Sequence, residues 1–177
     1  MKTILKSVLT LGLVAGLGFA ANAQKAATAD ASATVLADLT ITLDVTQDEI
    51  AFGNLSANTP GAIVLDANGI TNSNTGSVTN VARFDLGGAN SAVTVSYDAT
   101  VTLSNTDITP ATMTMTPEVV GSAAATNQET ATAVASGTTV TLVANEYFLW
   151  VGGTIPALLG QATGTYTGIF NIEVEYN

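Results

Sequence analysis

The sequence predicts an all-β protein built as a sandwich of mostly antiparallel strands. Thr, Val, Ile and Ala are abundant, whereas helix-favouring Lys, Arg, Glu and Gln are scarce. Apolar and polar residues alternate with a period of two along both ends of the chain. Turn-forming sequences, among them Asn68-Gly69, Gly87-Gly88 and residues 105–107, separate several short candidate strands. Many short strands with turns between them are typical of a sandwich or a barrel.

The first 23 residues have the pattern of a secretory signal peptide. Lys2 and Lys6 form a charged start, residues 7–20 are apolar, and residues 21–23 supply the small side chains of a cleavage site. We therefore expect a mature chain that begins at Gln24, without membrane insertion after cleavage. The expected location is the periplasm, the cell surface or the extracellular space of a Gram-negative bacterium.

The remaining chain predicts one domain preceded by an extension. We expect residues 24–37 to form an N-terminal extension and residues 38–177 a single β-sandwich domain, a length that can bury a substantial core. No cysteine is present, so neither disulfides nor lipid attachment to cysteine are available. Lys25 and Arg83 are the only cations beside 14 acidic residues in this part of the chain. This charge balance argues against a nucleic-acid partner.

The N-terminal alternation begins in the extension and continues into the expected first strand. Thr, Ser and Asp occupy most of the even positions between residues 28 and 44. The apolar odd positions of the extension are Ala27, Ala29, Ala31, Ala33 and Val35. These small side chains would suit a narrow groove on another chain, which makes the segment a candidate donor strand. The alternative is a frayed terminus followed by an ordinary first strand.

The C-terminal end has a second alternation, and shorter candidate strands lie between the two. Tyr166, Phe170, Ile172, Val174 and Tyr176 share one face of this last stretch. The intervening candidates are residues 62–65, 93–97, 100–103, 112–116, 138–143 and 147–151. Residues 147–151 do not alternate, which predicts a central strand with both faces covered and Trp150 in the core.

The residue types exclude most catalytic chemistry. With neither His nor Cys in the chain, the commonest general base, the thiol nucleophile and the usual zinc ligands are absent. We predict no catalytic, cofactor or metal-binding residues and no enzymatic activity. Residues 66–69 resemble part of a calcium loop, but a hairpin turn explains them better, and loop calcium stays open. An exposed Tyr97 is the better candidate for ligand contact.

Three motifs in this order resemble the DUF4402 family, which comprises small secreted bacterial domains without an assigned function. They are DEIAFGNL at residues 48–55, FLWVGGTI at residues 148–155 and GTYTG at residues 164–168. The layout is also similar to spore coat protein U-like domains and, more remotely, to chaperone–usher pilins. The resemblance implies an immunoglobulin-like or pilin-like sandwich.

The likeness to pilins is carried by the C-terminal strand. Pilin subunits typically end in a strand with a penultimate Tyr and a Gly fourteen residues from the end. Here Tyr176 is penultimate and Gly164 is fourteenth counting Asn177 as the first. The resemblance implies assembly by β-strand donation, with a second copy or a related surface subunit as partner and a periplasmic chaperone as a further one.

Two functions remain as expectations from the sequence. The first is a pilin-like, self-assembling structural subunit of the cell surface, with assembly residues in 27–35 and 164–176. The second is a monomeric secreted binding module that adheres to glycan or matrix.

Overall fold

The computed structural model describes residues 27–107 and 111–177, which fall into two units, residues 1–35 and residues 36–177. In the first unit, the described residues 27–35 are exposed and belong to no helix or strand. The expected signal peptide, residues 1–23, lies outside the described residues. Within the described residues, no helix is long and apolar enough to cross a membrane.

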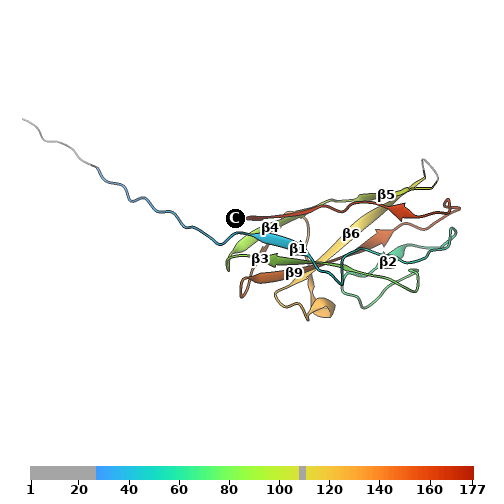
Figure 1. Ribbon diagram of the computed structural model, residues 1–177, viewed down its shortest axis with the longest axis horizontal. Coiled ribbons are helices and arrows are strands. Elements are labelled where there is room, and N and C mark those ends of the chain that lie inside the picture. Colours follow the sequence, from blue (N-terminus) through green and yellow to red (C-terminus); the bar gives the residue numbers. More distant parts are fainter. Residues whose placement is uncertain (1–26, 108–110) are drawn as a thin grey trace, which may run out of the picture. The chain divides into compact units, whose positions relative to one another are not determined.

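The second unit is all-β and forms a sandwich-like fold (Figure 1). A single short 3₁₀ helix, η1 (Gln128–Thr130), is the only helix among its described residues. Its strands are β1 (Thr40–Leu43), β2 (Ile63–Leu65), β3 (Ala82–Gly87), β4 (Ala92–Tyr97), β5 (Val101–Asn105), β6 (Thr112–Ser122), β7 (Thr132–Ala133), β8 (Thr138–Thr141), β9 (Glu146–Ile155), β10 (Tyr166–Thr167) and β11 (Ile172–Tyr176).

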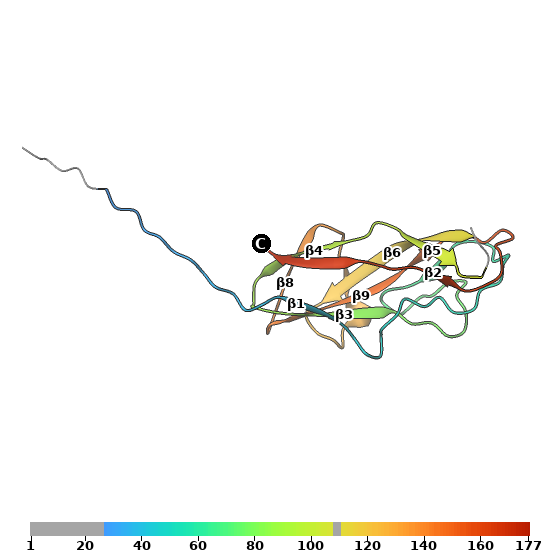
Figure 2. The same cartoon turned by 45° about the horizontal axis from the view of Figure 1, so that its top comes forward.

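The strands pair antiparallel in two sheets. The larger sheet has the order β1-β3-β9-β6-β5-β10, with β2 added beside β9 and β7 beside β6. The smaller sheet has the order β11-β4-β8. Consequently β1 and β10 are edges of the larger sheet, and β11 is an edge of the smaller one. Figure 2 shows β1 and the C-terminal strand on the same side of the domain.

The long strand β9 is the centre of the fold. Its Phe148 and Trp150 belong to one core cluster, whereas Leu149 and Val151 belong to the other, so both faces of the strand are covered. Trp150 is completely buried. The predictions of a central strand and of a core Trp150 are therefore confirmed.

The second core cluster lies between the two sheets. It combines residues of the larger sheet, such as Leu86 and Val119, with Val93 and Val95 of β4 and Val140 of β8. Leu39, Ile41, Ile172, Val174 and Tyr176 pack against this cluster but are only partly buried. This pattern indicates that the sandwich is filled at its centre and incompletely covered between β1 and β11.

Two sequence expectations need correction, whereas the N-terminal alternation becomes a strand only at Thr40, after the expected extension. β3 was not among the predicted strands, although it pairs with both β1 and β9. β6 extends to Ser122, well beyond the predicted residue 116, because β9 supplies a partner along that length.

Candidate functional site

A groove of about 720 Å³ opens between the edge of the larger sheet and the C-terminal segment of the chain. One wall comprises Leu43, residues 48–55 and Ala57, and the other comprises residues 161–168 and Phe170. Its floor is apolar and includes Phe84, Leu103, Met113, Met115 and Ile155. Many wall residues are exposed, so the space is an open groove rather than a sealed cavity.

The C-terminal wall presents unpaired backbone groups to this groove. The carbonyl oxygens of Thr165 and Asn171 accept backbone hydrogen bonds at 3.1 Å from the N–H groups of Thr106 and Asp98, which directly follow β5 and β4 on the far side. In an antiparallel ladder, the alternate residues between these hydrogen-bonded ones direct their N–H and C=O groups away from β5 and β4. Of the predicted residues on this segment, Gly164, Tyr166 and Phe170 line the groove. Ile172, Val174 and Tyr176 continue the open edge of β11 beyond the groove lining.

The side chains of that open edge point toward the interior. Ile172, Val174 and Tyr176 are partly buried, whereas Glu173 and Glu175 between them are exposed. The ring of Phe170 packs against Phe84 at 6.2 Å and against Tyr97 at 5.9 Å between centroids. One edge therefore offers both an apolar lining and a row of free hydrogen-bonding groups.

β1, which enters the opposite wall at Leu43, has an open edge of the same construction. The Asp44 N–H donates to the Arg83 carbonyl at 2.9 Å, which sets the pairing of β1 with β3. By the same alternation, Leu39, Ile41 and Leu43 direct their backbone groups away from β3. Ile41 is partly buried and Leu43 is 45 % exposed.

Hydrogen bonds join the two segments that carry the walls. Within the groove the Gln161 N–H donates to the Ala57 carbonyl at 3.0 Å. Beyond the groove lining the Tyr176 hydroxyl donates to the Ala37 carbonyl at 2.9 Å. Because residue 37 lies opposite residue 176, and Leu43 and Phe170 line the same space, β1 and β11 run in opposite directions.

Gly164 is required by its position in the wall. Its φ of +140° is unfavourable for residues with a side chain, and a Cβ there would lie 2.6 Å from the Asn105 amide nitrogen. Asn105 is buried and donates through that amide to the Thr163 carbonyl at 3.1 Å. A glycine at this position therefore lets the C-terminal segment approach β5 closely.

The predicted donor residues are not among those that line the groove. Ala27, Ala29, Ala31, Ala33 and Val35 are exposed, and Val35 is 94 % exposed. They belong to the first unit, whereas every groove residue belongs to the second. The sequence analysis did not identify the floor residues Phe84, Leu103 and Met113 as part of a site, because their convergence depends on how the sheets fold together.

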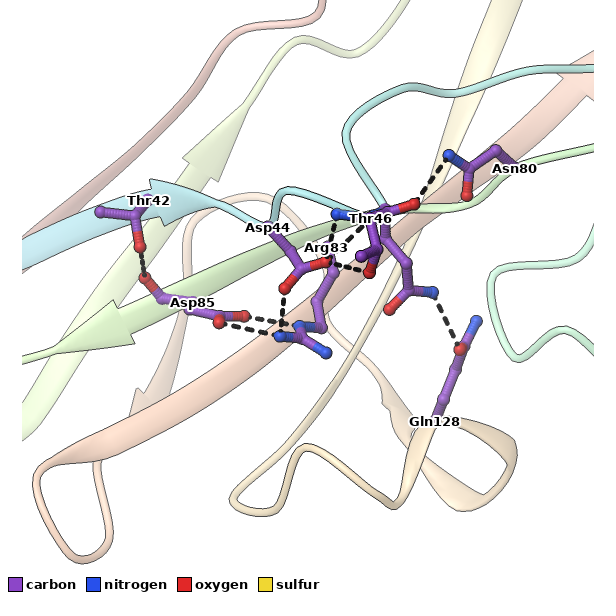
Figure 3. Close-up of polar contacts among 8 residues, drawn as sticks. Thr42, Asp44, Thr46, Asn80, Arg83, Asp85 and Gln128 are labelled. Atoms are coloured by element: carbon purple, nitrogen blue, oxygen red, sulfur yellow. Dashed lines mark hydrogen bonds and ion pairs between the residues drawn. The ribbon is translucent and has the colours of Figure 1, made fainter.

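Arg83 stabilises the turn that leads from β1 into the first groove wall (Figure 3). It forms ion pairs with Asp44 at 2.6 Å and with Asp85 at 2.7 Å. Its guanidinium carbon lies 5.8 Å from the centre of the Phe148 ring, within cation–π distance. Asp44 also accepts hydrogen bonds from the Thr46 hydroxyl, the Thr46 N–H and the Gln47 N–H.

These contacts make the turn sensitive to acid. Hydrogen bonds from the Thr46 hydroxyl, then from the N–H groups of Thr46 and Gln47, together with the charge of Arg83, lower the pKa of Asp44 from 3.8 to about 2. A carboxyl group whose pKa is lower in the folded state than in the unfolded state stabilises the fold at pH values above its unfolded-state pKa. This contribution is lost as the pH falls from about 4 through about 2.

We predict that Asp44→Asn removes part of this acid sensitivity. The amide oxygen still accepts hydrogen bonds but does not titrate, so the urea midpoint of the variant should change less between pH 5 and pH 2 than that of the parent. If the urea midpoints of the two proteins change equally between pH 5 and pH 2, Asp44 is not responsible for the acid sensitivity.

Two other candidates from the sequence are explained by local structure. The Asp66 carboxylate accepts hydrogen bonds from the N–H groups of Asn68, Ile70 and Thr71, which is the arrangement of a turn. Tyr97 is partly buried, and its hydroxyl donates to the Val134 carbonyl at 2.8 Å. The expectation of an exposed Tyr97 is therefore wrong. Within residues 27–107 and 111–177, no cluster of three or more acidic residues could hold a metal ion.

Fold and site together define an all-β domain with an open groove between two unpaired sheet edges. The model of the family described as "Domain of unknown function (DUF4402)" matches residues 39–176, and the chain belongs to this family. The match includes both groove walls and excludes residues 27–35. No curated protein matches the chain.

Proposed function

We propose that this protein is a non-enzymatic structural subunit of the bacterial cell surface that assembles by β-strand donation. Residues 27–35 of one copy would occupy the groove of the next copy. The observation that carries the proposal is the groove itself, which has an apolar floor between two edges with free backbone groups.

The chemistry of the groove suits an extended strand. A strand laid between β1 and the C-terminal segment would satisfy unpaired N–H and C=O groups on both sides, and it would cover the partly buried side chains that face the gap. Since β1 and β11 run in opposite directions, an inserted strand is antiparallel to one wall and parallel to the other.

The chemistry of residues 27–35 suits this groove. Their odd positions are small and apolar, and their even positions are Thr28, Asp30, Ser32 and Thr34, which would remain in solvent. Small side chains allow the donor backbone to approach the floor closely. The segment is exposed and unpaired in its own chain, so donation breaks no strand pairing there.

Location and partners belong to the same proposal. The predicted signal peptide would export the chain to the periplasm, from which it reaches the cell surface or the medium. An open apolar groove is an aggregation hazard until it is filled. We therefore include a periplasmic chaperone that covers the groove temporarily, and a second copy or a related subunit as the final partner.

The proposal is tested by the assembly state of the purified exported chain. Size exclusion and unboiled gel electrophoresis should show a ladder of species, and negative-stain microscopy should show filaments. A chain that stays monomeric at millimolar concentration contradicts the proposal and leaves the monomeric binding module for glycan or matrix as the remaining function.

A further inference from the structure

Tyr176, at the end of β11, connects the turn after β3 with the residues that precede β1. Those residues follow directly on residues 27–35, here called the donor segment. Its hydroxyl accepts a hydrogen bond from the Ala89 N–H at 2.6 Å and donates one to the Ala37 carbonyl at 2.9 Å. A side chain at Gly88 would collide with this hydroxyl, so the turn between β3 and β4 fits closely around it. The backbone at Ala37, two residues after Val35, is therefore fixed to the end of β11.

The position of Ala37 matters because the donor segment and one groove wall are continuous in sequence. β1 begins at Thr40, so a chain reversal between residues 36 and 39 would allow residues 27–35 to lie along β1 in the groove of the same chain. A segment attached by so short a connection has an effective concentration in the millimolar range. Unless this insertion is prevented, it would compete strongly with donation to a second copy.

Two features oppose the reversal. Residues 36–39, Leu-Ala-Asp-Leu, contain no Gly, Asn or Pro, the residues that tight hairpin turns favour. In addition, a hairpin at Ala37 would rotate its peptide group and break the hydrogen bond from Tyr176. The sequence of residues 36–39 disfavours the turn, and the hydrogen bond from the Tyr176 hydroxyl to Ala37 opposes it further.

We propose that Tyr176 is a positioning residue that keeps residues 27–35 out of the groove of their own chain and so directs them to a second copy. This inference depends on the proposed function, because it concerns the choice between two grooves for one donor segment. It assigns to the Tyr176 hydroxyl a role distinct from that of its ring, which packs against the core between the sheets.

The test compares Tyr176→Phe with Tyr97→Phe in the full exported chain. Both substitutions keep an aromatic ring and remove a hydrogen bond from a hydroxyl to a backbone carbonyl, but the Tyr97 hydroxyl bonds to Val134 and not to the segment that precedes β1. The readouts are the ladder on unboiled gels, the melting temperature, and uptake of a fluorescent peptide of residues 24–35 by the monomer fraction.

We expect Tyr176→Phe to shift most of the protein from the ladder into monomers that do not take up the peptide, because their own segment fills the groove. Tyr97→Phe should retain the ladder. Equal ladders in the two variants, or Tyr176→Phe monomers that take up the peptide readily, overturn the inference. A parent protein without a ladder overturns the proposed function instead.

A second variant leaves both groove walls intact. Ala37→Asn combined with Asp38→Gly introduces an Asn-Gly turn where residues 27–35 would reverse. We expect this double variant to form monomers that exclude the peptide, and a ladder equal to that of the parent would contradict the inference. If Tyr176→Phe does not fold, the double variant decides the question alone.

Discussion

Changing Ala31 and Ala33 together to Asp should abolish the ladder of assembled species. Both side chains lie on the face of the donor segment that would contact the groove floor, where an uncompensated carboxylate costs several kcal/mol, on the order of 2–7 for a polar group without a partner. Each 1.4 kcal/mol reduces an association constant about tenfold, so even the lower end of this range is visible on a gel.

The matched control changes Ser32 and Thr34 to Asp. These residues are on the opposite face, so the added charge is the same but stays in solvent, and the ladder should persist. All four positions are exposed in their own chain, which means that neither variant should alter the melting temperature of the monomer. Equal loss of assembly in both variants would indicate general charge repulsion rather than a buried donor face.

Trp150→Ala should destabilise the domain by roughly 3–5 kcal/mol, as truncation of a buried aromatic side chain does. Trp150 is fully buried on β9, and its ring lies 6.4 Å from that of Phe148. The resulting cavity would lie at the centre of the larger sheet, where neighbouring strands on both sides limit relaxation. Urea unfolding followed by circular dichroism measures the change.

Trp150→Phe is the informative control for this prediction. The indole nitrogen of Trp150 has no hydrogen-bond partner among the described residues, and a buried donor without a partner is itself unfavourable by about 1–3 kcal/mol. Removing that donor while retaining an aromatic ring should cost much less than Trp150→Ala. Similar losses for the two variants would mean that the indole contributes an interaction beyond packing.

The elements that the sequence predicted correctly are those whose patterns depend on local periodicity. The apolar run at residues 147–151 predicted a strand covered on both faces, and β9 has both faces in core clusters. The parity of Ile172, Val174 and Tyr176 predicted one shared face, which the structure places toward the interior. Turns at Asn68-Gly69 and Gly87-Gly88 were also recognisable from their residue types.

The errors have two physical causes. β3 alternates apolar Ala82, Phe84 and Leu86 with charged Arg83 and Asp85, and the charges obscured a strand whose outer face is stabilised by ion pairs. The groove floor was not predictable because it combines residues of four strands, β3, β5, β6 and β9.

The most direct test of the account is a disulfide between two copies. The chain has no native cysteine, so one copy can carry Thr34→Cys and the other Thr167→Cys or Glu173→Cys without competing thiols. Thr167 and Glu173 are exposed. Their backbone N–H and C=O groups point toward β5 and β4, and therefore away from the open edge. If a donor strand pairs antiparallel with this edge, each of these residues forms a non-hydrogen-bonded pair with the donor residue opposite. The two Cα atoms of such a pair are about 4.5 Å apart, within the range for a disulfide.

A third acceptor, Thr141→Cys, is the control, because it is exposed on β8 at the other edge of the smaller sheet. Mixed under mild oxidation, Thr34→Cys should form a covalent dimer with Thr167→Cys or with Glu173→Cys, and whichever acceptor reacts reports the direction of the donor strand. It should not react with Thr141→Cys. If neither groove position forms the dimer, or if Thr141→Cys reacts as readily, residues 27–35 of one copy do not occupy the groove of another.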